Sequence, residues 1–423
     1  MRIIFVCFLF AFASANAGNI LLKADGFIDV RTGELIRPAE ILVEDGRIAE
    51  INGDFQGDDF EIVDLPGKIL LPGLMDMHVH LDLDFEDANF GIVVTESGSE
   101  AALRGAKNAE RTLMAGFTTV RNVGQVHPTL DLVDVALARA SSEGWINAPR
   151  IIPAGHMITI LGGHGDLSMA EGLAEGVLEL GPEYGVVSSV DDATKATRFQ
   201  IKHGAKVIKI HATAGVMSLE DSVGLQQLRD EEMKAIVDEA RRHEIPVAAH
   251  AHGTEGIKAA IRAGVQSIEH GSILDGDAIR MMKRNGVFLV PTNGLMDLID
   301  YDKLHPQKRA KAEYVDPLAD ESLIAAVEAG VKVAIGTDAP LIPHGMNAYE
   351  IVKMTQRGMS PLEALQAATL VASELAGIEE LGELKVGWHA DIIGVSRNPV
   401  EDISSLQSVE FVMKAGNIVK NVE

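Results

Sequence analysis

The stretch 71-LPGLMDMHVHLD-82 guides the interpretation of the whole chain. It is an apolar run of strand length that is preceded by a Pro-Gly pair. Two histidines, His78 and His80, lie near its C-terminal end. Residues two apart lie on the same face of a β-strand. A buried strand has little use for two imidazoles on one face unless they bind something in common. The stretch therefore predicts a strand that presents two metal ligands near its C-terminal end.

Seven further apolar runs follow, and segments of helical periodicity separate them. The eight runs are GLMDMHVH (73–80), FTTVRNVG (117–124), RIIPAGH (150–156), KVIKIHA (206–212), PVAAHAHG (246–253), VQSIEHGS (265–272), GVFLVPTN (286–293) and KVAIGTDA (332–339). This alternation predicts an α/β fold, a (β/α)8 TIM barrel spanning residues 73–380. A doubly wound open sheet is the alternative, but it would want a Gly-rich phosphate loop after an early strand, and the sequence has none. The segment 360–377 is expected to be helical, with Ser360 and Glu363 as a capping box.

Both ends of the remaining chain read as short strands and turns. The stretch 41-ILVEDGRIAEI-51 alternates around an Asp-Gly turn, and 409-VEFVMKAGNIVKN-421 contains a Gly-Asn turn. Neither end is long enough for a core of its own. We therefore expect residues 18–72 and 381–423 to form one small composite β-sandwich beside the barrel; two unrelated ends are the alternative.

The composition excludes some partners. The 423 residues carry a formal charge of -25, so nucleic acid and anionic membranes would be repelled. Residues 1–17 are typical of a signal peptide, with Arg2, the apolar run 3-IIFVCFLFAFA-13 and an A-x-A site at Ala15–Ala17. We expect cleavage after Ala17 and export to a periplasm or the medium; an uncleaved membrane anchor is the alternative, for which the run is short. After cleavage we expect no membrane span.

The single cysteine limits the chemistry of the mature chain. Cys7 lies inside the predicted signal peptide, so the mature chain would contain no thiol. A zinc ion would then have only nitrogen and oxygen ligands. A cysteine nucleophile and disulfide bonds are excluded for the same reason.

Lys209 lies between Ile208 and Ile210, which places its side chain in the middle of a buried strand. A buried ammonium group is costly unless it finds a partner. The lysine either pairs with a carboxylate or reacts with carbon dioxide to form a carbamate, an anionic ligand suited to bridging two metals. His211 follows on the same face, where a hydrogen-bonded core histidine explains it at least as well as a catalytic role.

The later runs add further candidate ligands. His250 and His252 repeat the spacing of two, His270 ends the sixth run, and Asp338 ends the eighth. An aspartate at this place can bind a metal and accept the proton of an attacking water, or it can cap the next helix. Together with the first histidines, these side chains predict a metal centre at one end of the barrel.

Two residues are candidates for substrate binding. His164 lies in GGHGD, within the long segment 157–190, and its flanking glycines allow close approach to a ligand. A segment of this length is typical of a lid or substrate loop, or of an oligomer contact. Arg121, at the end of the second run, meets either a substrate carboxylate or a structural ion-pair partner.

Taken in order, the fragments HVH, IKI with its lysine, HAHG, EHGS and GTDA resemble the amidohydrolase superfamily with a binuclear metal centre. The resemblance covers essentially the whole mature chain. It is greatest to the imidazolonepropionase-like branch, which includes Xaa-Pro dipeptidase-like enzymes, metal-dependent carboxypeptidases and ochratoxinase-like amide hydrolases. Many relatives are homo-oligomers. One departure is Ala214, which stands where relatives often have glycine, so the resemblance leaves the close substrate preference open.

The resemblance implies a role for each candidate. One metal would be bound by His78, His80 and Asp338, and the second by His250 and His270, with a carboxylated Lys209 and a hydroxide as bridges. Asp338 would carry the proton to the leaving amine, His252 would polarise the scissile carbonyl, and His164 would line the substrate site. The implied cofactors are two divalent ions, with zinc expected and manganese or cobalt as alternatives.

The implied reaction is hydrolysis of an amide bond. A small-molecule substrate is expected: a dipeptide or an N-acyl amino acid that releases its C-terminal amino acid, with ochratoxin-type aryl amides as further candidates. Opening of a cyclic amide or deamination is the alternative within the superfamily. A non-catalytic protein on the same fold would be expected to lack a ligand, whereas all six ligand positions are filled here.

Overall fold

The computed structural model of the protein describes residues 19–55, 59–84, 92–169, 173–174, 176–219 and 222–422. The predicted signal peptide lies outside these residues. None of the helices in the described ranges combines the length and the apolar composition that a membrane crossing requires.

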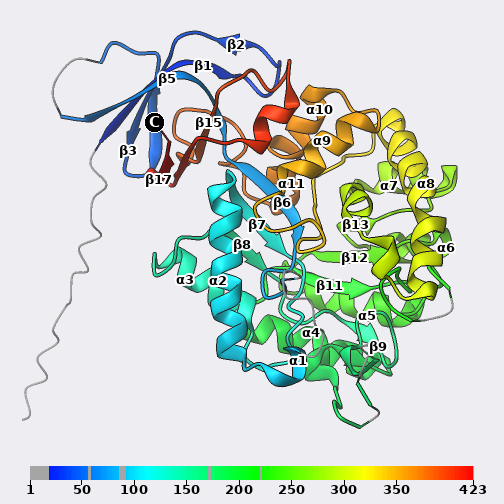
Figure 1. Ribbon diagram of the computed structural model, residues 1–423. Coiled ribbons are helices and arrows are strands. Elements are labelled where there is room, and N and C mark those ends of the chain that lie inside the picture. Colours follow the sequence, from blue (N-terminus) through cyan, green and yellow to red (C-terminus); the bar gives the residue numbers. More distant parts are fainter. Residues whose placement is uncertain are drawn as a thin grey trace, which may run out of the picture.

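Seven of the eight predicted runs form parallel strands in two sheets (Figure 1). The three-stranded sheet has the order β6 (Leu74–Val79), β7 (Phe117–Asn122), β8 (Arg150–Pro153), and the four-stranded sheet has the order β11 (Ile208–His211), β12 (Val247–Ala251), β13 (Ser267–His270), β14 (Phe288–Val290). Almost every residue of these strands is buried, because helices cover their outer faces. The α/β class with parallel sheets is confirmed.

Isolated parallel bridges link the edges of the two sheets. Ile158, just after β8, pairs with Ile210 of β11. The eighth run, residues 332–339, pairs with β14 through Leu289 and Val333, and with β6 through Val79 and Ala339. The run was expected to be a regular strand, but the structure gives it only these bridges. Asp338 interrupts the extended backbone with a φ of 53°.

Helices separate the parallel strands, as the sequence predicts. Their bounds are α1 (Ile92–Thr95), α2 (Gly98–Met114), α3 (Val133–Ser142), α4 (Val190–His203), α5 (Asp230–Arg241), α6 (Thr254–Ala263), α7 (Gly276–Asn285), α8 (Pro306–Ala329), α9 (Ala348–Gln356), α10 (Pro361–Ala367) and α11 (Leu370–Ala376). The predicted capping box of Ser360 and Glu363 starts α10. The expected single helix over 360–377 is instead two helices, because Thr369 takes a non-helical φ of -131° between them.

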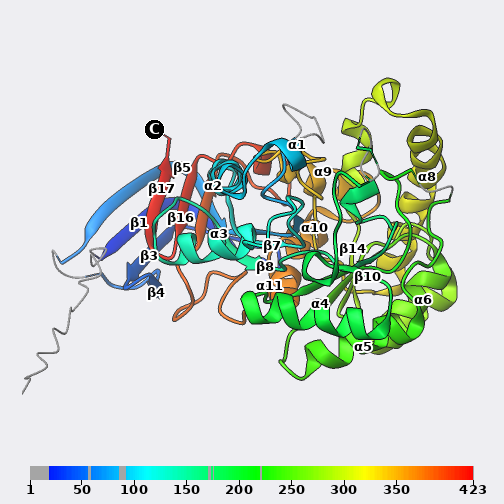
Figure 2. The same ribbon diagram turned by 90° about the horizontal axis from the view of Figure 1, so that it is seen from below.

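Both ends of the chain join one mixed sheet beside the parallel strands (Figures 1 and 2). Its strands are β1 (Ile20–Ile28), β2 (Leu35–Ile36), β3 (Ala39–Glu44), β4 (Arg47–Ile51), β5 (Glu61–Pro72), β15 (Ile392–Val395), β16 (Phe411–Lys414) and β17 (Asn417–Asn421). The long strand β5 pairs in parallel with β1 and antiparallel with β15, which makes the sheet continuous. Apolar side chains from both ends, such as Leu22 and Phe411, pack in one cluster. The division of the chain into a sandwich and a barrel at residues 72 and 381 stays a prediction.

In its described residues, the long segment 157–190 contains short elements. These are β9 (Thr159–Ile160), β10 (Val186–Val187) and the 3-10 helices η1 (Leu167–Met169) and η2 (Pro182–Tyr184). Three further 3-10 helices are η3 (Asn293–Leu298), η4 (Tyr301–Lys303) and η5 (Ile403–Gln407). Of these, η3 follows β14 and lies beside the site described next.

Candidate metal centre

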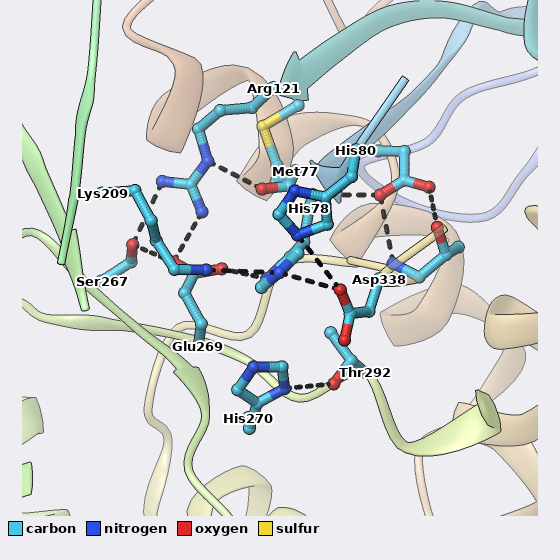
Figure 3. A network of polar contacts seen from close by, with 12 residues as sticks. Met77, His78, His80, Arg121, Lys209, Ser267, Glu269, His270, Thr292 and Asp338 are labelled. Atoms are coloured by element: carbon cyan, nitrogen blue, oxygen red, sulfur yellow. Dashed lines mark hydrogen bonds and ion pairs between the residues drawn. The ribbon is translucent and has the colours of Figure 1, made fainter. Parts of the chain in front are cut away.

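The carboxyl ends of the parallel strands surround a cavity of about 210 Å³. The strand register brings residues of different runs together there. His211 of β11 is paired with His250 of β12, and Ala251 of β12 is paired with His270 of β13. The predicted residues that line this cavity are His78, His80, His164, Lys209, His250, His252, His270 and Asp338. Side chains that are far apart in the sequence therefore face one space, as expected (Figure 3).

The first candidate metal position lies between His78, His80 and Asp338. The Nε2 atoms of both imidazoles lie 3.3 Å from Oδ1 of Asp338. Each Nδ1 faces an acceptor instead, the Glu269 carboxylate at 2.8 Å for His78 and the Gly124 carbonyl at 2.7 Å for His80. An imidazole that donates from Nδ1 presents the Nε2 lone pair, which is the arrangement a metal ligand needs.

A second candidate position lies between His250, His252 and His270. One ligand atom from each lies within 4.8 Å of the other two. Nδ1 of His270 lies 2.7 Å from Oγ1 of Thr292, which orients the ring. Nε2 of His250 is buried and has no hydrogen-bond partner among the described residues. A buried nitrogen without a partner is costly in a protein, and a cation would satisfy it.

Burial sets the charge of these imidazoles. It lowers the pKa of His250 and His270 well below the ordinary value for histidine, and lowers that of His252 to about 3. The rings are therefore neutral at physiological pH, which is the form that binds a metal. Burial alone would raise the pKa of Asp338, but the neighbouring imidazoles of His78, His80 and His270 outweigh it and hold the carboxyl well below its usual range. The cavity thus offers the neutral imidazoles of His250, His252 and His270 and the carboxylate of Asp338, a set of donors that suits divalent cations.

Lys209 lines the same cavity and lies next to the first position. Its side chain is 1% exposed, and Nζ lies 3.3 Å from Nε2 of His78 (Figure 3). Burial lowers the pKa of the lysine to about 8, although the Glu269 and Asp338 carboxylates act in the opposite direction. At this pKa about a tenth of the amine is uncharged at pH 7, far more than for an ordinary lysine. The uncharged amine is the form that can react with carbon dioxide.

Arg121 lies behind the centre and does not line its cavity. Its guanidinium donates to the Met77 carbonyl, to Oγ of Ser267 at 3.1 Å and to Oε1 of Glu269 at 2.7 Å. Of the two predicted alternatives, the structure favours the ion pair over a contact with substrate. Sequence reasoning missed Glu269, whose pKa burial would raise but Arg121 and His78 lower to about 2. The signal for it was an acidic residue within the strand-length run 265–272, directly before His270.

Asp76 is a second residue that sequence reasoning missed. Its buried carboxylate accepts hydrogen bonds from the Thr337 hydroxyl, the Asn347 amide and the backbone N–H of His78. These contacts fasten the first run to the segment that carries Asp338. The backbone is unusual here, because His270, Thr292 and Asp338 have φ values of 69°, 51° and 53°. Non-glycine residues rarely adopt this left-handed conformation, and they cluster at functional sites when they do.

His164 and His211 form the wall next to the second position. The His164 ring stacks on that of His250 with centroids 4.4 Å apart, and its Nδ1 lies 2.7 Å from Oγ of Ser218. His211 was expected as readily in the core as in the site. The structure places it in the cavity wall, with a buried Nδ1 that has no hydrogen-bond partner among the described residues.

Comparison with known proteins agrees with this geometry. The family described as "Amidohydrolase family" matches residues 69–419. A curated protein named ochratoxinase, from Aspergillus niger, is 32% identical over 442 aligned residues that cover 96% of this chain and 88% of the relative. The crystal structure of a Xaa-Pro dipeptidase with bound methionine has a TM-score of 0.88 and 36% identity, covering 95% of this chain and 100% of that one. The crystal structure of A. niger ochratoxinase has a TM-score of 0.83 and 30% identity, covering 96% of each chain. The chain thus belongs to the amidohydrolase family and is a hydrolase that acts on carbon–nitrogen bonds.

Proposed function

We propose that the protein is a metal-dependent hydrolase that cleaves the amide bond of dipeptides or N-acyl amino acids and releases the C-terminal amino acid. The observation that carries the proposal is the convergence of His78, His80 and Asp338 with His250 and His270 on one cavity, which Lys209 also lines next to His78. The similarity to proteins named ochratoxinase and Xaa-Pro dipeptidase supports amide cleavage rather than another reaction of the family.

Six side chains would hold two divalent cations, and zinc is the proposed metal. His78, His80 and Asp338 would bind one cation, His250 and His270 the other, and Lys209 would bridge them as its carbamate. When bound, such cations polarise a carbonyl and make a water acidic enough to attack it at neutral pH. The neutral, buried donors described above fit this role.

Two side chains would move or hold protons. Asp338 is ionised, so its carboxylate can accept the proton of the attacking water and pass it to the leaving amine. Nδ1 of His252 lies 2.8 Å from the Ser272 hydroxyl. If that hydroxyl donates to Nδ1, the neutral ring carries its proton on Nε2 and can donate it to the oxygen of the scissile carbonyl. His164, in the cavity wall, would contact the substrate.

The bridges between the sheets support a closed barrel. Segment 332–339 contacts both β14 and β6, and Ile158 joins the region after β8 to β11. We propose that the eight runs form the (β/α)8 barrel, with the centre at the C-terminal ends of its strands, where such barrels carry their active sites.

The test combines metal analysis with a panel of substrates. The purified chain, loaded separately with zinc, manganese or cobalt, is assayed on dipeptides, N-acyl amino acids, an aryl amide of phenylalanine, a cyclic amide and a lactone. We expect two metal equivalents and hydrolysis of the linear amides. His78→Ala and Lys209→Ala should lose bound metal and lower kcat/KM by a factor on the order of 10³ or more. Asp338→Asn should lower kcat far more than it alters folding.

His203→Ala is the matched control, because His203 is an exposed histidine on α4. It should keep wild-type metal content and rates. A wild-type protein that binds no metal and resists chelators, or that opens only the cyclic amide, would contradict the proposed function.

A further inference from the structure

The cavity is lined by two chemically different sets of side chains. One set consists of the histidines, Lys209 and Asp338, and the other of apolar side chains, many of which belong to one cluster. We call this second set the apolar wall, and its members used here are Val216, Leu295, Met296, Val315, Ala319 and Leu341. They come from the loop after β11, from η3, from α8 and from the segment after Asp338. All six belong to a single apolar cluster, so the wall is a continuous surface and not a set of scattered contacts.

Two buried polar side chains hold the wall in shape. The carboxyl group of Glu350, on α9, accepts hydrogen bonds from the backbone N–H groups of Asn293 and Gly294 at 2.9 and 2.5 Å, which fixes the start of η3. Nζ of Lys311, on α8, donates to the carbonyls of Gly215 and Ser218 at 2.8 and 2.6 Å. The loop that carries Val216 is thereby tied to α8. The wall is formed before any ligand binds.

The wall offers no partner for a charged substituent. Among the described residues that line the cavity, Lys209 and Asp338 are the charged ones, and both belong to the proposed metal centre. A lysine or aspartate side chain of a substrate would lose its water there without an ion-pair partner. Burying an unpaired charge in this way is strongly unfavourable, whereas an aliphatic or aromatic group gains from leaving water.

We propose that the apolar wall selects the substrate: amides with a large, uncharged, apolar side chain beside the scissile bond are accepted, and those with charged side chains there are rejected. The inference rests on the proposed function, since it names the substrate class of the same cavity. Ala319 is the residue best placed to test it. It lies in the wall on α8, it is 6% exposed, and replacing its methyl group with a carboxylate adds the missing charge.

The experiment compares kcat/KM on two series of dipeptides, in which leucine, phenylalanine, alanine, lysine or aspartate occupies the acyl half or the leaving half. In at least one half of the dipeptide, kcat/KM with leucine or phenylalanine should exceed kcat/KM with alanine by about tenfold or more. This is the specificity that extra methylene groups give in an apolar pocket. The values of kcat/KM with lysine and aspartate should be lower than that with alanine. Ala319→Asp should lower kcat/KM on leucine and raise it on lysine, while kcat/KM on aspartate stays low because the two carboxylates repel each other.

Two variants serve as controls. Ile324→Asp adds the same charge to α8 at a position that is 40% exposed and outside the cavity, and it should keep the wild-type order. Ala319→Val preserves the apolar character if Ala319→Asp fails to fold; it should reduce the rate on phenylalanine more than that on alanine. Metal content and thermal unfolding of each variant show whether the fold is intact.

Binding of reduced-amide dipeptides, which cannot be hydrolysed, separates this inference from the proposed function. Tight binding of the leucine analogue and weak binding of the lysine analogue, without cleavage of any amide, would retain the apolar wall and remove the proposed reaction. Cleavage of amides with no difference between leucine, lysine and aspartate in either half would overturn the inference and leave the proposed function standing. An unchanged order in a folded Ala319→Asp would overturn it as well.

Discussion

Glu269 connects the candidate metal centre to a buried ion pair. One carboxylate oxygen faces Nδ1 of His78 at 2.8 Å, and the other accepts from Arg121 at 2.7 Å. The His78 side chain is 1% exposed and that of Glu269 is fully buried, so neither interaction is screened by water. A carboxylate behind a ligating histidine fixes the ring and makes its other nitrogen a stronger ligand.

Glu269→Gln should therefore weaken metal binding by about 10- to 100-fold, the usual effect of losing such a partner. Competition against a chelator of known affinity measures the change. Glu269→Gln also leaves the Arg121 charge buried without its partner, which should lower the free energy of unfolding. The double variant Glu269→Gln/Arg121→Met should recover stability without recovering metal affinity.

Asp391→Asn is the control for this pair. It breaks another ion pair, in which Asp391 lies 3.0 Å from Arg150, away from the centre. Stability should fall while the metal affinity stays at the wild-type value. Equal metal affinity in Glu269→Gln and wild type would show that the glutamate has a purely structural role.

At the residue scale, the candidate ligands were predictable and their supports were not. His78, His80, Lys209 and Asp338 each interrupt an apolar run, which marks them in the sequence. Glu269 also interrupts an apolar run, but its structural role depends on Arg121, a residue from another strand. Such a pairing is decided by the packing of β7 against β13 and is not visible in either strand alone.

Among the elements, η3 has its start held by a titrating group, the Glu350 carboxyl. Burial raises the pKa of the Glu350 carboxyl to about 7, and the backbone N–H groups of Gly294 and Asn293 limit the rise. A glutamate in the unfolded chain titrates near pH 4.3. Between these values the folded protein holds a proton that the unfolded chain has released. Linkage then requires that this contribution to stability is present at low pH and is lost as the pH rises toward and through 7.

The prediction is that Glu350→Gln flattens the pH dependence of the free energy of unfolding between pH 5 and pH 8. The glutamine keeps a carbonyl acceptor for the start of η3 but does not titrate. Chemical denaturation at four pH values gives the slope for each protein. Other groups, including Asp134 with a pKa of about 6, contribute equally to both slopes and cancel in the comparison.

Glu313→Gln on α8 controls for the loss of a charge, because its side chain is 54% exposed. Its slope should match that of the wild type. Coincident slopes for wild type and Glu350→Gln would mean that the carboxyl titrates as in the unfolded chain, contrary to the prediction.

Secondary structure was predictable where a single local sequence pattern, such as an apolar run or a capping box, determines it. The apolar runs became strands, and the capping box at Ser360 started a helix where expected. Two segments differ from the prediction. Thr369 divides the segment 360–377, and its hydroxyl donates to the Leu365 carbonyl. The eighth run is not a regular strand, because Asp338 turns toward the imidazoles instead of continuing the extended backbone.

On the scale of the whole molecule, the order of the runs predicted the parallel sheets, because each strand–helix–strand unit places its strands in parallel. The matching alternation of both chain ends predicted one small composite β-sandwich, and in the structure both ends contribute strands to one mixed sheet. The continuity of that sheet through β5 was not predicted, since its 12 residues pair with different partners along their length. Export, cleavage after Ala17 and a homo-oligomeric state stay proposals.

The proposed leader gives the last prediction. Expression of the full chain in a bacterium with a secretion pathway should yield a periplasmic or secreted protein whose intact mass begins at Gly18. Replacing Ala15 and Ala17 with bulky residues should block cleavage, since the site requires small side chains. A secreted product that retains Met1 would contradict the proposal. Light scattering of the same sample gives the oligomeric state.

The left-handed backbone at His270 and Asp338 links thermostability to loss of function. Each such conformation costs on the order of 1–3 kcal/mol, and the folded chain bears this cost even with no cation present. Glycine would remove the cost at either position and would also remove a ligand. Directed evolution of this protein for thermal stability alone would thus favour inactive variants. A screen for more stable variants has to measure catalytic activity in the same round.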